Sequence, residues 1–76
     1  MNDKDRRKVK KMVESLSVVH KELDEMCKDM EIRIDNLAEK FQDRAEEGEM
    51  QYNMINKAML KLKESIDFLN EVSKKV

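Results

Sequence analysis

The chain has 76 residues, of which 43% are charged and 4% aromatic, with one glycine, one cysteine and no proline or tryptophan. Its length excludes more than one domain, and its composition is typical of long helices rather than compact mixed folds. The formal net charge is −1, and a single cysteine excludes an intrachain disulfide. We therefore expect one all-α domain over residues 1–76.

The sequence predicts a cytoplasmic protein without a membrane partner. Its N-terminus lacks the apolar stretch of a secretion signal, and its longest run of large aliphatic residues is Val18-Val19. A membrane-spanning helix needs about 20 mainly apolar residues. A lone cysteine also fits a reducing compartment.

Residues from about 5 to 34 form the first predicted helix, because apolar residues recur there every three or four positions without a helix breaker. A second register begins at Ile34. The spacing is therefore four residues from Met26 to Met30 and again four residues from Met30 to Ile34. Such a stutter shifts the apolar stripe around the helix axis. The seam of the first register consists of Val9, Met12, Leu16, Val19, Leu23, Met26 and Met30, and its flanks carry Val13, Cys27 and Ile34.

The segment between the two registers carries the helix-breaking signals. Asn36 with Glu39, and Asp43 with Glu46, have the spacing of an N-terminal capping box. Gly48 is less favourable than Ala inside a helix by about 1 kcal/mol. These signals favour two helices of matched length. One continuous helix forming a coiled-coil rod stays open as the alternative, because the second register passes through Gly48 without a phase error.

Residues from about 44 to 75 form the second predicted helix. Its register, counted from Ile34, consists of Ile34, Ala38, Phe41, Ala45, Gly48, Tyr52, Ile55, Met59, Leu62, Ile66, Leu69 and Val76. A mostly apolar side stripe accompanies it, formed by Met54, Ala58, Ser65, Phe68 and Val72. An apolar surface this wide suits a helix with two neighbours, as in a four-helix bundle.

We therefore predict an antiparallel, coiled-coil-like helical hairpin with a connector at about residues 35–43. Two hairpins are expected to join as a homodimer, because the side stripe would otherwise stay in water. The residues expected at the oligomer interface are Val9, Met12, Leu16, Val19, Leu23, Met26, Met30, Ile55, Met59, Leu62, Ile66 and Leu69.

Residues 35–42, Asp-Asn-Leu-Ala-Glu-Lys-Phe-Gln, are followed by Gly48-Glu49 and by heptads at residues 58–62 and 65–69. This region, about residues 35–72, resembles a loose family of short helical-hairpin proteins from Gram-positive bacteria, phages and mobile elements. The family pattern has Pro where this chain has Ala38. The resemblance implies a helix, a short connector and a second helix, and it implies no activity.

Charge is divided unevenly along the chain. Residues 1–11 hold six basic and two acidic side chains. Residues 12–49 hold five basic and twelve acidic side chains, and residues 50–76 hold five basic and three acidic ones. A hairpin would gather the cations of both chain ends at one end, opposite an acidic connector. This basic end could contact phosphate or an acidic partner, or serve only as a solvated surface. The candidate contact residues are Lys4, Arg6, Arg7, Lys8, Lys10, Lys11, Lys74 and Lys75.

One set of residues has a spacing found in metal sites. His20, Asp24 and Cys27 lie at i, i+4 and i+7, but a zinc site would need a fourth ligand from elsewhere. Packing on the flank of the seam is the simpler interpretation, and no metal or other cofactor is expected. The sequence has no Glu-x-x-His pair, no glycine-rich loop and no visible nucleophile–base pair, so we expect no enzyme.

The leading hypothesis is a non-enzymatic protein–protein interaction module, a small oligomer that regulates, inhibits or adapts another protein. Its origin from a phage or mobile element is implied by the resemblance. The alternatives are a hairpin dimer that binds nucleic acid through its basic end, a sponge for an anionic nucleotide, and a structural scaffold.

Overall fold

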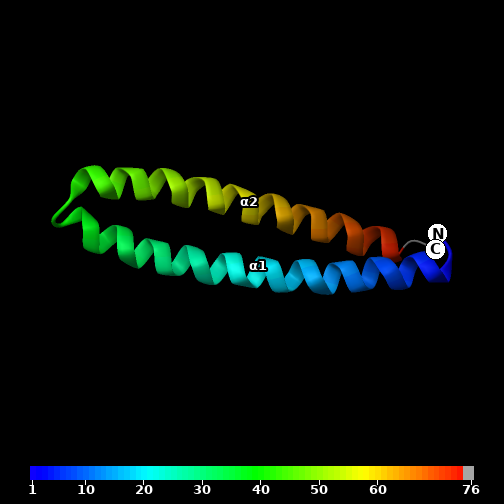
Figure 1. Ribbon diagram of the computed structural model, residues 1–76. Coiled ribbons are helices and arrows are strands. Elements are labelled where there is room, and N and C mark those ends of the chain that lie inside the picture. Colours follow the sequence, from blue (N-terminus) through cyan, green and yellow to red (C-terminus); the bar gives the residue numbers. More distant parts are fainter. Residues whose placement is uncertain (75–76) are drawn as a thin grey trace.

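The computed structural model describes residues 1–74, which form an antiparallel hairpin of two long helices (Figure 1). Helix α1 spans Asp3–Ala38 and helix α2 spans Gln42–Lys74, and the hairpin is 57 Å long. The helical hairpin is thus confirmed, and the continuous rod is wrong. Lys75 of the predicted basic end and Val76 of the predicted second register lie outside the described residues.

The chain reverses within residues 39–41, a shorter connector than predicted. The carbonyl of Leu37 accepts hydrogen bonds from the amides of Lys40, at 3.1 Å, and Phe41, at 2.6 Å, which ends α1. The predicted capping residues Asn36 and Asp43 lie inside helices instead. The acidic side chain of Asp43 is still favourable in the first turn of α2, where the helix dipole is positive.

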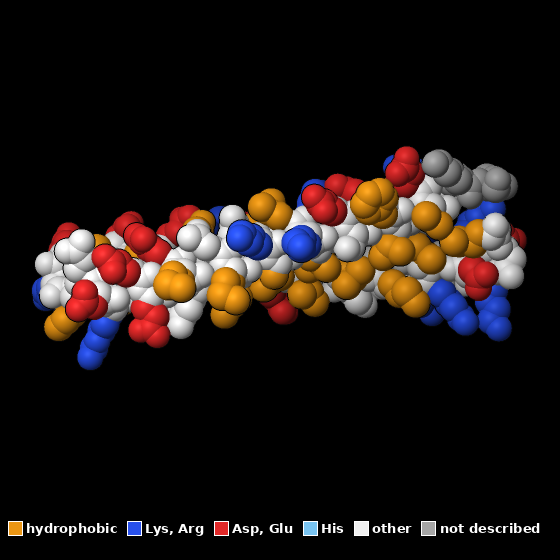
Figure 2. Space-filling model, turned by 90° about the horizontal axis from the view of Figure 1, so that it is seen from above, with side chains coloured by type: hydrophobic (Ala, Val, Ile, Leu, Met, Phe, Trp, Pro, Cys, Tyr) orange, Lys and Arg blue, Asp and Glu red, His pale blue; other side chains and the backbone are white. Residues whose placement is uncertain are grey.

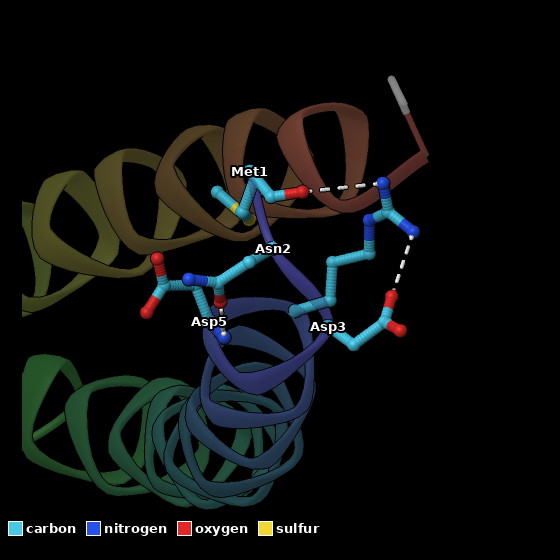
Figure 3. A network of polar contacts seen from close by, with 5 residues as sticks. Met1, Asn2, Asp3 and Asp5 are labelled. Carbon is cyan, nitrogen blue, oxygen red and sulfur yellow. Dashed lines mark hydrogen bonds and ion pairs between the residues drawn. The ribbon is translucent and has the colours of Figure 1, made fainter.

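The start of α1 is capped by Asn2, a role that the sequence analysis missed (Figure 3). The Asn2 side-chain oxygen accepts a hydrogen bond from the backbone N–H of Asp5 at 2.8 Å. Arg6 donates to the Met1 carbonyl at 3.3 Å and pairs with the Asp3 carboxylate at 3.4 Å. The Asn2 cap and the acidic side chains of Asp3 and Asp5 in the first turn offset the unfavourable placement of cations at a helix N-terminus.

The seam of α2 follows the predicted second register. Ala45 and Ile66 are buried, and the residues between them recur at steps of three and four. Two earlier members of the register are wrong, because Ala38, the last residue of α1, and Phe41, in the connector, are exposed. The seam positions that are buried or half-buried are Ala45, Gly48, Tyr52, Ile55, Met59, Leu62, Ile66, Leu69 and Ser73.

The seam of α1 differs from the prediction. Met12, Val19 and Met26 are 54%, 44% and 46% exposed, although they were expected in the seam. The observed row keeps steps of three and four throughout and has no stutter. An unbroken heptad faces its neighbour along the whole hairpin, whereas a stutter would turn the stripe away from α2. The row consists of Val9, Val13, Leu16, His20, Leu23, Cys27, Met30, Ile34 and Leu37.

The core of this two-helix structure is thin. Within residues 1–74 the buried hydrophobic side chains are Cys27, Met30, Ile34, Ala45 and Ile66, and none of them is below 2% exposure. Most of them lie in the half of the hairpin nearer the connector. The rest of the seam is half-buried, because a pair of helices cannot enclose its own contact surface.

Candidate interaction face

Both helices carry apolar side chains beside the seam that a single hairpin leaves exposed. On α1 these are Met12, Val19 and Met26, which were predicted in the seam but lie outside it. On α2 they belong to the predicted side stripe, where Met54 is 71% exposed and Phe68 is 67% exposed. We call the whole set the apolar face, and it consists of Met12, Val19, Met26, Met54, Ala58, Ser65, Phe68 and Val72.

The residues from α1 and α2 lie on the same face of the hairpin. Val19 directly precedes the seam residue His20, and Ser65 directly precedes the seam residue Ile66. In an antiparallel pair of right-handed helices, the positions that precede the seam fall on one common face. Figure 2 shows hydrophobic side chains gathered along one long flank of the hairpin. Met12 of α1 and Leu69 of α2 also line one open hollow.

The opposite face is polar. It is formed by the positions that directly follow the seam residues, and the apolar residues among these positions are Ala38 and the exposed Leu60. On this face the Tyr52 hydroxyl donates a hydrogen bond of 2.5 Å to the Glu31 carboxylate, which ties α2 to α1. Its polar residues include Lys10, Ser17, Asp24 and Glu31 of α1 and Glu49, Asn53, Asn56, Lys63 and Asn70 of α2.

Two titratable groups near this link keep their protons at neutral pH. The hydrogen bond to Glu31 raises the pKa of Tyr52 above its ordinary value. Burial raises the pKa of the Cys27 thiol, and the carboxylates of Asp24 and Glu31 raise it further. The thiolate is the reactive form of cysteine, so the protonated Cys27 is unreactive. It packs as a small apolar group.

The candidate metal ligands do not gather around a common point. His20 is half-buried in the seam, Cys27 is buried there, and Asp24 pairs with Lys28 at 3.2 Å. In the part of the chain that the structure describes, no three His, Cys, Asp or Glu side chains come together in a way that could hold a metal ion.

The hairpin brings most of the predicted basic residues to one end. Lys4, Arg7, Lys8 and Lys11 are exposed, and their spacing of i, i+3, i+4 and i+7 places them together on the side of α1 away from α2. Lys10 is exposed on the polar face, and Lys74 ends α2 beside them. Arg6 is set apart, because its guanidinium is turned toward Met1 and Asp3.

No family model, curated protein or solved structure matches this chain. Over residues 1–74, neither helix has a stretch that is both long and apolar enough to cross a membrane.

Proposed function

We propose that this chain is a non-enzymatic protein–protein interaction module, in which two hairpins join through the apolar face into a four-helix bundle. The bundle then regulates, inhibits or adapts another protein. The observation that carries the proposal is the exposure of Val19 and Phe68 on one face. Full burial of such a side chain is worth about 1.5–3 kcal/mol, so several together rival the whole stability of a small domain.

The thin core supports the same proposal. A short helical chain seldom buries enough apolar surface to be stable alone, and self-association is a common remedy. A second hairpin would cover the apolar face, and would give the half-buried seam residues Leu16, Leu23 and Leu69 a further layer to pack against.

The proposed dimer is tested by the mass of the chain in solution, measured by light scattering. Val19→Glu is expected to convert the dimer to a monomer, because it places a charge in the centre of the apolar face. Val18→Glu is the matched control, since Val18 is 59% exposed on the side of α1 away from the apolar face. A wild-type monomer at high concentration, or equal effects of the two variants, would contradict the proposal.

The regulatory part of the proposal needs a separate test. Immobilised wild-type dimer is expected to retain one specific protein from a lysate in stoichiometric amount, and the Val19→Glu monomer is the control. If wild type and monomer retain the same background proteins, the regulatory role is wrong even where the dimer is present.

Nucleic-acid binding is the second candidate function, and the stripe of Lys4, Arg7, Lys8 and Lys11 favours it. The stripe has no aromatic residue for base stacking, so contacts would be made with the phosphate backbone. Binding to double-stranded RNA should then weaken steeply as salt is raised. An affinity that is the same at low and high salt would exclude this candidate.

A further inference from the structure

The α1 row of the apolar face is symmetric about Val19. Met12 and Met26 are each seven residues, or two helical turns, from Val19. Asp5 and Arg33 are each fourteen residues from Val19 and continue the same row at its two ends. The row therefore has the same apolar pattern in both directions, and its ends carry opposite charges.

The α2 row has its own centre at the same level. Leu16 and Leu69 line one hollow, so they lie at nearly the same height along the hairpin. Val19 is three residues beyond Leu16, and Ser65 is four residues before Leu69, which places Val19 and Ser65 about one turn further toward the connector.

Ser65 is also a centre of symmetry for α2. Ala58 and Val72 are each seven residues from it. The two rows therefore share one centre, and the residues there are small. Because α1 spans Asp3–Ala38, this centre also lies close to the middle of the hairpin.

We infer that the occupant of the apolar face is a second copy of this chain, docked head to tail about a two-fold axis near Val19 and Ser65. This inference rests on the proposed dimer and adds its orientation. Val19 then meets the partner's Val19, and Met12 meets the partner's Met26. Asp5 meets the partner's Arg33, and the two hairpins overlap along nearly their whole length.

Charge favours this orientation over the one in which both connectors lie at the same end. Residues 1–11 hold six basic and two acidic side chains, whereas residues 39–49 hold two basic and five acidic ones. Head-to-tail docking places each basic end beside the partner's acidic connector. The other orientation would place like charges together at both ends, which is unfavourable.

The charged residues that flank the apolar rows are available for contacts between copies. Lys8 lies eleven residues before Val19 and Asp29 ten residues after it, so they also approach each other across the two-fold axis. All four flanking residues are exposed, and none forms an ion pair within residues 1–74; they are Asp5, Lys8, Asp29 and Arg33.

The orientation is tested by the distance between spin labels on Lys40→Cys in a Cys27→Ala background, with light scattering on the labelled protein. Head-to-tail docking predicts a separation close to the 57 Å length of the hairpin. A separation within about 20 Å, two helix diameters, would overturn the inference. A dimer with that short distance would leave the proposed function intact, whereas a monomer would remove both.

Charge reversal gives an independent test. Asp5→Arg and Arg33→Asp should each weaken the dimer about tenfold, because each creates two repulsive contacts. The double variant should restore the wild-type dissociation constant. Glu25→Arg, on the side of α1 away from the apolar face, is the matched control and should have little effect. A double variant no tighter than the single variants would overturn the inference.

Discussion

Ile34 occupies the space that a side chain on Gly48 would need: a Cβ there would stand 3.0 Å from Cγ1 of Ile34 and 3.7 Å from Cδ1. The glycine has an ordinary helical backbone, since the structure shows no positive φ at a glycine among the described residues. Its role is therefore the close approach of the two helices near the connector. The buried Ile34 fills the gap that the missing side chain leaves.

Gly48→Ala is expected to stabilise the hairpin by less than the roughly 1 kcal/mol that helix propensity alone provides, because the new methyl group crowds Ile34. In an Ile34→Ala background the same substitution should recover the full gain. Urea unfolding followed by circular dichroism measures the four free energies of unfolding. The coupling free energy is the difference between the effect of the double variant and the sum of the two single effects. A value below about 0.5 kcal/mol would mean that the two positions are independent.

Asn2→Ala should lower the free energy of unfolding by about 1 kcal/mol, because it removes the oxygen that accepts from the Asp5 amide. The loss matters more here than at most helices, since the following turns carry several cations. Asn53→Ala, at an exposed position inside α2, is the control and should leave stability unchanged or raise it slightly. Equal losses in both variants would argue against the cap.

The Tyr52 hydroxyl should ionise above its ordinary pKa of 10.0, because ionisation breaks the hydrogen bond to Glu31. Glu31→Gln removes the charged acceptor and should lower the pKa of Tyr52 toward 10.0. Since the chain has one tyrosine, ultraviolet absorbance reports this group alone. Glu49→Gln is the matched control, because Glu49 lines the same hollow as Tyr52 and should have much less influence.

Cys27 should make stability depend on alkaline pH. The unfolded thiol ionises near 9.0, whereas burial raises the pKa of the folded thiol, so the folded state keeps its proton longer. The stabilising contribution is present below pH 9.0 and is lost as the pH rises from there toward the raised value. Denaturant unfolding of Cys27→Ala on both sides of 9.0 should show a shallower fall than wild type. An equally steep fall would assign the effect to other groups.

The α2 seam was predictable because its row is clearly more apolar than the neighbouring one. Ile55, Leu62 and Leu69 belong to the seam, whereas the side stripe beside it includes Ala58 and Ser65. Gly48 also fits this row, although glycine signals a helix break. The helix continues there because tight packing against Ile34 compensates for its low helix propensity.

The α1 seam was not predictable from hydropathy, because two rows lie one residue apart. Met26 and Val19 belong to one row, and Cys27 and His20 to the other, which looks less apolar. The row that forms the seam is the one that stays in phase with α2 over the full length of the hairpin. This depends on both helices together and cannot be read from α1 alone. Met12, Val19 and Met26, the predicted seam residues that the observed row leaves out, form the α1 part of the apolar face.

Dilution should be a strong perturbation of this protein. With five buried side chains among residues 1–74, a separated hairpin has little to oppose local opening. The proposed dimerisation would stabilise the folded chain by mass action, so that the melting temperature would rise with concentration. At low concentration the separated hairpins would be open to proteolysis, whereas at high concentration the dimer would be protected. The amount of folded protein in a cell would then rise more than proportionally with its rate of synthesis.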